Sequence, residues 1–232
     1  LHEEQTSEDV VRRPVKWGTF VLALVIAACG ESDAEVAADA QADAETVMDE
    51  TAYQFRLDSE RSDPGDFQIT EEEGAVRILT GPAGIAYHTA DSVNSGNFRI
   101  DATFTQYGAP LGYREAYGVF VGGRELDGPE LEYTYFLVRP TGDYLIKRRV
   151  GEITETIVDW TPHGGVMQVL AEGDEPENTM TIEAADGQIN FIINSQLAHS
   201  MIVSEARPHG IAGLRANHRL DIRITGWSVT GS

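Results

Sequence analysis

One stretch of the chain, residues 131–150, constrains the fold more than any other. Two runs rich in β-branched and aromatic residues flank Pro-Thr-Gly-Asp at 140–143, and these residue types favour a tight turn. The stretch therefore predicts a β-hairpin in which the two runs are neighbouring antiparallel strands.

The pairing register decides which residues of this hairpin share a face. If Arg139 pairs with Tyr144, one face is mainly apolar and aromatic, and we expect that face to pack into the core. The other face is mixed, and we expect it to turn toward solvent or a ligand. The candidate ligand-binding residues on this mixed face are Glu132, Thr134, Phe136, Lys147 and Arg149.

The rest of the C-terminal part repeats the short-strand pattern. Alternating apolar runs recur about every ten residues between turns rich in Gly, Pro, Asp and Asn, which is typical of a sandwich of two sheets. Besides the two hairpin strands, we expect strands at 53–57, 66–69, 75–79, 85–89, 97–106, 115–121, 153–158, 179–184, 188–193, 199–203, 210–215 and 220–229. The sequence therefore predicts an all-β fold, a two-sheet antiparallel β-sandwich, over residues 51–232.

The N-terminal segment has the order of parts found in a secretory signal. A basic stretch at 12–16 precedes an apolar run at 17–28, which is too short to span a bilayer because a spanning helix needs about 20 apolar residues. The residues upstream of the basic stretch are acidic, so we expect translation to begin at Val10 or Val11. A buried apolar helix with an incidental cysteine is the alternative interpretation.

The sequence Ile26-Ala27-Ala28-Cys29 resembles the lipobox of bacterial lipoproteins. The resemblance implies that residues 1–29 contain a signal peptide cleaved before Cys29, and that a lipid on Cys29 anchors the mature chain to a membrane. In such lipoproteins an Asp after the cysteine favours the inner membrane. Gly30 stands there instead, which favours the outer membrane of a Gram-negative cell envelope. Cys29 is the only cysteine, so no internal disulfide can form.

Residues 30–50 differ in composition from everything that follows. They include eight Asp and Glu and no Lys or Arg, with Ala filling much of the rest. Such a segment buries too little to offset its ordering entropy, so we interpret it as a disordered acidic tether. The alternative is a tail that sequesters metal or binds a partner. The chain's net charge is −21, and its folded part is itself acidic, which argues against nucleic acid as a partner.

Four segments follow one another in a characteristic order: Asn-Ser-Gly-Asn with an alternating strand at 94–105, the strand at 115–123, the hairpin at 131–150, and Gly-Ile-Ala-Gly-Leu-Arg at 210–215 before a closing strand at 221–229. In order and spacing they resemble the concanavalin A-like lectin/glucanase domains. The resemblance implies a jelly-roll sandwich with an accessible concave sheet. It leaves the function open, because this fold occurs in lectins, hydrolases and structural modules.

One motif suggests an enzyme. Glu125, Asp127 and Glu130 fit the Glu-x-Asp-x-x-Glu spacing of family 16 glycoside hydrolases, which implies a nucleophile, its electrostatic partner and a general acid/base. Retaining chemistry needs two carboxyl groups about 5 Å apart. However, Gly128-Pro129 is a turn signal, and proline cannot donate to a ladder inside a central strand. We therefore favour an exposed acidic loop without a catalytic role.

Other residues give weaker signals. Trp160 could stack on the apolar face of a sugar, or it could plug the edge of the sandwich. Calcium is compatible with this fold, and the acidic loop at 127–132 could supply oxygen ligands, whereas no two histidines have zinc-ligand spacing.

Three functions therefore remain open. The favoured one is a lipid-anchored, lectin-like domain that binds a glycan or related polymer without catalysis. The second is a glycoside hydrolase, of the family 16 type or related to keto-disaccharide hydrolases. The third is a structural module that assembles into a larger envelope complex.

Overall fold

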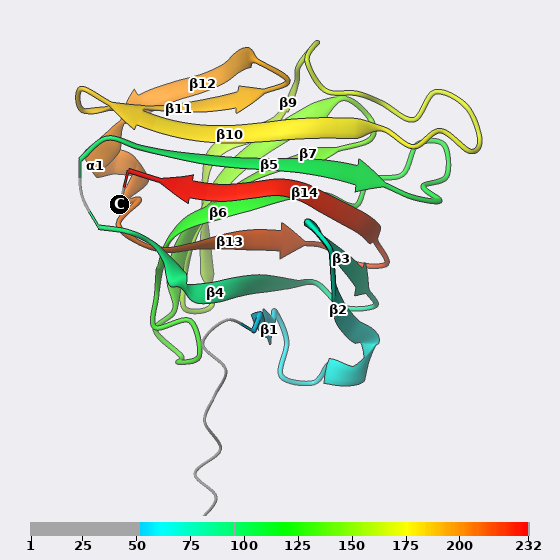
Figure 1. Ribbon diagram of the computed structural model, residues 1–232, viewed down its shortest axis with the longest axis horizontal. Coiled ribbons are helices and arrows are strands. Elements are labelled where there is room, and N and C mark those ends of the chain that lie inside the picture. Colours follow the sequence, from blue (N-terminus) through cyan, green and yellow to red (C-terminus); the bar gives the residue numbers. More distant parts are fainter. Residues whose placement is uncertain (1–51, 95, 232) are drawn as a thin grey trace, which may run out of the picture. The chain divides into compact units, whose positions relative to one another are not determined.

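The computed structural model describes residues 52–94 and 96–231, which form two antiparallel seven-stranded sheets packed face to face (Figure 1). This arrangement confirms the predicted all-β sandwich. The predicted signal peptide, the predicted lipidation site Cys29 and the predicted acidic tether lie outside the described residues.

Sheet A has the strand order β1-β4-β13-β6-β7-β8-β9, and sheet B the order β12-β11-β10-β5-β14-β3-β2. The strands of sheet A are β1 (Gln54–Leu57), β4 (Gly84–Val93), β13 (Gly210–Ala216), β6 (Tyr117–Arg124), β7 (Glu132–Arg139), β8 (Asp143–Val150) and β9 (Ile153–Pro162). Those of sheet B are β12 (Gln196–Ile202), β11 (Gln188–Ile193), β10 (Glu177–Ala185), β5 (Phe98–Gln106), β14 (Asp221–Thr230), β3 (Ala75–Thr80) and β2 (Phe67–Glu72). A short 3-10 helix η1 (Pro64–Asp66) and an α-helix α1 (Val203–Ala206) complete the described elements. Each predicted strand overlaps one of these strands.

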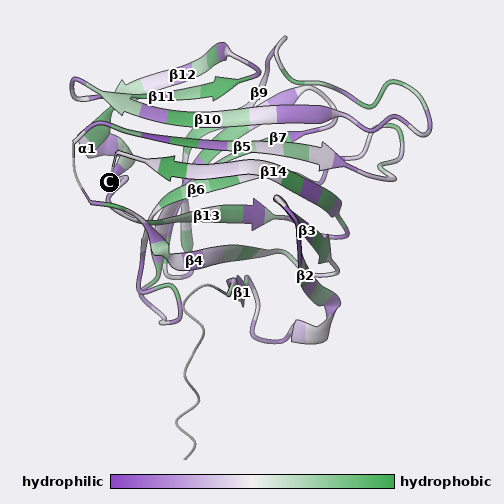
Figure 2. Ribbon diagram, viewed as in Figure 1, coloured by the Kyte–Doolittle hydropathy of each residue, from purple (hydrophilic) through white to green (hydrophobic). Residues whose placement is uncertain are grey.

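Sheet B follows the one-sided pattern of a sandwich whose outer surface faces water. Along β5, Phe98, Ile100, Ala102 and Phe104 are buried between the sheets, with more exposed residues alternating between most of them. Figure 2 shows hydrophobic and hydrophilic residues interspersed along β5 and β14. The alternating burial of residues in this sheet therefore follows from the period-two pattern of the sequence.

Sheet A differs because its central strands are buried on both faces. All residues of β6 from Tyr117 to Gly123 are buried, as are those of β7 from Tyr133 to Val138. One set packs against sheet B, and a second hydrophobic cluster on the outer face includes Phe120, Tyr133 and Leu137. Other parts of the chain must therefore cover the outer face of these central strands.

The predicted hairpin forms, but its register is shifted by one residue. Arg139 pairs with Asp143 rather than Tyr144, because the turn contains three residues, 140–142. Gly142 lies in the left-handed region at φ 93°, and its N–H donates to the carbonyl oxygen of Arg139 at 3.0 Å. Three-residue hairpin loops commonly place glycine in such a conformation.

The shift moves the side chains of β7 to the opposite face from the one predicted. Glu132, Thr134 and Phe136 point toward sheet B, where Phe136 belongs to the inter-sheet core. Lys147 and Arg149 pair with residues of the outer cluster and lie on the outer face of sheet A. The prediction that these five residues share one ligand-facing surface is therefore wrong.

Candidate functional site

Thr134 helps to hold the helix that closes one end of the sandwich. Its Oγ1 donates to the carbonyl oxygen of Ala206 at 2.8 Å, and its cross-strand partner Arg148 donates to the carbonyl oxygen of Glu205. Both carbonyls belong to the last turn of α1, where backbone acceptors have no partner inside the helix. Thr134 and Arg148 therefore have a structural role, because both hold the C-terminal end of α1.

Glu132 and Phe136 are also engaged within the protein. Glu132 forms ion pairs with Arg124 at 3.0 Å and Arg207 at 3.1 Å. Partial burial opposes its ionisation, but the hydrogen bonds and charges of these two arginines hold the pKa of Glu132 below its usual value. Phe136 is fully buried and inaccessible to a ligand in this conformation.

Trp160 lies on β9, which is one of the two edge strands of sheet A. The guanidinium carbon of Arg139 lies 4.2 Å from the centroid of the Trp160 ring, a cation–π contact. The indole is half-buried and packs against the outer cluster. A role of Trp160 in stacking on a sugar stays a prediction.

The strongest candidate site lies where two segments cover the outer face of sheet A. One segment contains β1 and the residues that follow it, and the other is the loop at 125–131. Two adjoining hollows of about 330 and 360 Å³ border these segments and share Arg56, Ser59 and Glu60. Together we call them the Arg56 pocket. Its other lining residues are Phe55, Leu57, Asp58, Arg61, Ser62, Pro64, Asp127, Pro129, Leu131, Arg149, Gly151 and Glu152.

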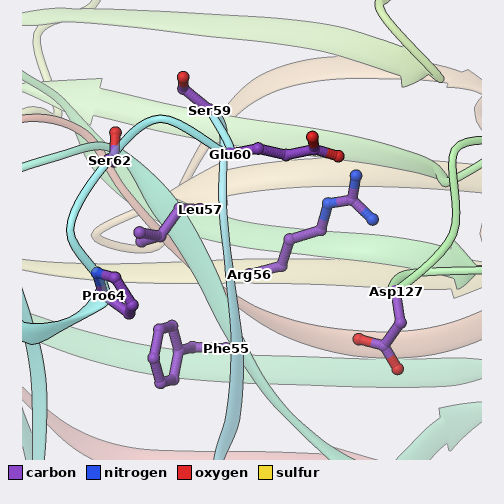
Figure 3. A pocket seen from close by; sticks show the side chains of 8 residues that line it. All are labelled: Phe55, Arg56, Leu57, Ser59, Glu60, Ser62, Pro64 and Asp127. Atoms are coloured by element: carbon purple, nitrogen blue, oxygen red, sulfur yellow. The ribbon is translucent and has the colours of Figure 1, made fainter.

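The charged and apolar side chains of this pocket are separated. In Figure 3, Arg56 and Glu60 extend to the side of the segment on which Asp127 lies, while Phe55, Leu57 and Pro64 lie on the other side. Guanidinium groups donate hydrogen bonds and carboxylates accept them. The pocket therefore offers both kinds of partner to a ligand, beside a small apolar surface.

Arg56 fixes the loop that forms one wall of the pocket. Its Nη1 donates to the carbonyl oxygens of Leu126 at 2.8 Å and Gly128 at 2.7 Å. From beneath, the Tyr87 hydroxyl donates to Asp127 Oδ1 at 2.8 Å. Burial, and then the hydrogen bond and charge of Asp127, raise the pKa of Tyr87, so its hydroxyl stays protonated and can act as this donor.

Asp58 fixes the other wall. It forms ion pairs of 2.6 Å with both Arg149 and Arg215, and Arg215 Nη1 also donates to the Tyr133 hydroxyl at 2.9 Å. Burial of Asp58 opposes its charge, but hydrogen bonds and charges from the two arginines hold the pKa of its carboxyl below the usual value. Arg215 is buried above the Tyr135 ring, with its guanidinium carbon 4.8 Å from the ring centroid.

The candidate catalytic residues lie in a loop. Glu125, Asp127 and Glu130 fall between the end of β6 at Arg124 and the start of β7 at Glu132, and their side chains are exposed. Glu125 has a left-handed backbone with φ 48°. The structure thus supports the predicted acidic loop, and it brings only Asp127 of the three to the Arg56 pocket.

Within residues 52–94 and 96–231, no group of three or more His, Cys, Asp or Glu side chains is arranged to hold a metal ion. Calcium binding by the loop at 127–132 stays a prediction. No helix in the same part of the chain is both long and apolar enough to cross a membrane.

Comparison with known proteins defines the fold class. No family model matches the chain, and no curated protein matches its sequence. Among solved structures, it is similar to the carbohydrate binding module CBM66 from Bacillus subtilis, with a TM-score of 0.50, 8% identity, and coverage of 76% of this chain and 95% of that one.

Two further solved structures have the same architecture. The Emp46p carbohydrate recognition domain in its potassium-bound form gives a TM-score of 0.51 at 11% identity, with 76% of this chain and 87% of that chain covered. Alginate lyase A1-II′ gives 0.50 at 12% identity, with 78% and 94% covered. The described residues therefore have the jelly-roll sandwich fold found in lectins and carbohydrate-binding modules. At these identities the likeness concerns the fold alone.

Sequence reasoning missed most of the Arg56 pocket. Of its lining residues, only Arg149 and Asp127 were among the candidates. The signal that could have pointed to it is the alternation of charge in Arg56-Leu57-Asp58-Ser59-Glu60-Arg61, directly after a short strand. Alternating charges of this kind also occur on ordinary solvated segments, so the pattern gains meaning only once Arg149 and Arg215 are known to face it.

Proposed function

We propose that the chain is a lectin-like protein of the cell envelope that binds a glycan, without catalysis, in the Arg56 pocket. A lipid on Cys29 tethers it to the membrane, with the outer membrane as the favoured location. The observation that supports glycan binding is the pocket itself, in which arginine donors and carboxylate acceptors converge on one hollow. Sugar hydroxyls both donate and accept, so a pocket of mixed partners suits them.

Preorganisation of the pocket supports the same proposal. The Arg56 guanidinium is held by two backbone carbonyls, and Asp58 is held between two arginines. Groups fixed before binding lose little freedom when a ligand arrives, which favours affinity for a weakly apolar ligand such as a sugar. The carbohydrate-binding module and recognition domain of similar fold are consistent with this ligand class.

A glycan array probed with the full chain tests the proposal. We expect a restricted set of glycans to bind the wild type and a Glu60→Ala variant to lose that binding, because Glu60 lines both hollows of the pocket. Glu172→Ala is the matched control, since Glu172 is an exposed acid outside the pocket. Binding to no glycan, or equal binding by both variants, would contradict the Arg56 pocket as a glycan site.

The proposed anchor has its own test. In a Gram-negative host, metabolic labelling with a fatty-acid probe is expected to mark the wild-type chain and to leave a Cys29→Ser variant unmarked. Fractionation of the labelled cells then separates outer from inner membrane. An unlabelled wild-type chain would contradict the lipid anchor and would leave the glycan proposal unaffected.

A further inference from the structure

A hollow separate from the Arg56 pocket opens where β14 is longer than its neighbour β3. The β3 register covers only Asp221 to Thr225, whereas β14 continues to Thr230 (Figure 1). A bulge between Thr225 and Ser228, with Gly226 at φ 62°, interrupts the ladder to β5 at this point. This break lies beside Trp227, which faces β4 of the other sheet.

Trp227 connects the two sheets across this opening. Its indole Nε1 donates to Asp91 Oδ2 on β4 at 2.7 Å, which restrains the orientation of the ring. The cavity beside it has a volume of about 350 Å³ and is also lined by Tyr53, His88, Glu71 and Glu72. We call it the edge cleft.

The cleft combines aromatic rings with acidic groups. The rings of Tyr53 and His88 are in contact, with centroids 3.7 Å apart. Glu71 lines the cleft together with Tyr53, and Asp91 is hydrogen-bonded to Trp227 of the same cleft. Burial, and then the negative charges of Asp91 and Glu71, raise the pKa of Tyr53. Glu71 and Glu72 line the cleft, and neither Lys nor Arg does.

Glu71 is the acid best placed to form an ion pair with a ligand. It lies at the end of β2 and has no ion-pair partner among the described residues, whereas Glu72 pairs with Arg223 at 3.3 Å. Glu71 pairs in register with Val76, a partly buried residue that packs against the inter-sheet core and also lines the cleft. An exposed carboxylate thus lines the same cavity as the side chains of Tyr53, His88 and Trp227, and no Lys or Arg lines that cavity.

We propose that the edge cleft binds an amino sugar with a free ammonium group. The ammonium would lie beside Glu71 and over an aromatic face, where cation–π attraction adds to charge pairing. The sugar ring would stack its apolar face on Trp227 or Tyr53. A carboxylated or phosphorylated ligand would be repelled, and so would the chain's own acidic segment at 30–50. This inference does not depend on the Arg56 pocket.

Calorimetric titration of the full chain with a glucosamine tetramer tests the proposal, with the N-acetylglucosamine tetramer as the uncharged match. We expect the glucosamine tetramer to bind at least about tenfold more tightly, because acetylation removes the charge that pairs with Glu71. Glu71→Gln should weaken the binding by about fivefold, as expected for the loss of a partly exposed charge pair. Glu73→Gln should not, since Glu73 lies in the same hairpin but outside the cleft.

The Glu73 control separates specific binding from general attraction between a cationic ligand and an acidic protein. Equal weakening in the two variants would show only such general attraction and would overturn the proposal. Failure of the glucosamine tetramer to bind, or equal affinity for the two tetramers, would also overturn it. Tetralysine is the last probe, and affinity for it equal to that for the glucosamine tetramer would replace the sugar with a basic peptide.

Discussion

The Arg56 pocket and the edge cleft are held together by different interactions. The Arg56 pocket is held by ion pairs and by hydrogen bonds to backbone carbonyls, and it presents both donors and acceptors. The edge cleft is held by packing, by the hydrogen bond from Trp227 to Asp91 and by the ion pair of Glu72 with Arg223, and its charged residues are all acidic. The two sites therefore suit ligands of different charge although they belong to one sandwich.

The difference also concerns how each site depends on the fold. Removing one ion-pair partner from the Arg56 pocket leaves a buried guanidinium without its counterion, which is costly. Removing one acid from the edge cleft leaves groups that water can reach. Substitution of Asp58 should therefore change stability and binding together. Substitution of an exposed acid, either Glu60 in the pocket or Glu71 in the cleft, should change binding alone.

The largest expected effect follows from Asp58→Ala. This change removes the shared partner of Arg149 and Arg215, and Arg215 is buried. We expect the free energy of unfolding to fall by about 3 kcal/mol, as for other buried charges left unpaired. Urea denaturation measures it, with Glu172→Ala as a control that should change stability by less than about 0.5 kcal/mol. A comparable stability for both variants would mean that the ion pairs do not hold the pocket together.

The stability of the Asp58 wall should depend on pH in a defined direction. The folded-state pKa of Asp58 lies below its unfolded value, so its contribution is complete above the unfolded pKa of about 3.9 and is lost as pH falls through the folded pKa. The stability difference between the wild type and Asp58→Asn should therefore be constant above about pH 5 and shrink below about pH 4. The other carboxyls with lowered pKa values, Glu132, Asp101 and Asp143, are present in both proteins and cancel in the difference. Denaturation curves at a series of pH values measure this difference, and a difference that grows on acidification would contradict the assignment.

Smaller effects should separate the two sites from each other. We expect Glu60→Gln to weaken glycan binding about fivefold and to leave glucosamine tetramer binding unchanged, with Glu71→Gln giving the reverse result. Both changes replace an exposed carboxylate by an amide of the same shape, so both variants should keep the wild-type stability. Paired titrations measure this, and an effect of either substitution at both sites would mean that the sites are coupled or that binding is non-specific.

The fold could be predicted because its signals are local. Alternation in segments such as 97–106 and 188–193, between turns rich in Gly, Asp and Asn, locates the strands without any knowledge of their neighbours. The prediction fails where the assignment of one turn residue decides which faces the residues of a whole strand occupy. Counting Asp143 as a turn residue rather than the first residue of β8 shifted the register by one and placed Thr134 and Phe136 on the wrong face.

The candidate site could not be predicted for a related reason. Asp58 meets Arg149 and Arg215 across 91 and 157 residues of sequence, and no spacing rule connects them. Period-two patterning also suggests one apolar face per strand, yet β7 is buried on both faces because residues 125–131 cover its outer side. The edge cleft depends likewise on the length of β14 relative to β3, which follows from pairing rather than from either strand alone.

The smallest expected effect follows from replacing Glu125 and Glu130, and it tests whether the glycan is only bound or is also hydrolysed. Glu125 and Glu130 are exposed and lie outside the lining of the pocket, whereas Asp127 lines it and accepts a hydrogen bond from Tyr87. Replacing both glutamates by Gln should therefore change affinity for an array-selected glycan by less than about twofold, while Asp127→Asn should weaken it several-fold.

Because retaining hydrolysis needs a pair of carboxyl groups across the sugar bond, a glycosidase would lose turnover in the double variant and keep binding. Chromatography of the glycan after long incubation with the wild type measures turnover. Cleavage by the wild type that is abolished in the double variant would make the loop at 125–131 a reaction centre, and intact glycan in both would leave the pocket as a binding site.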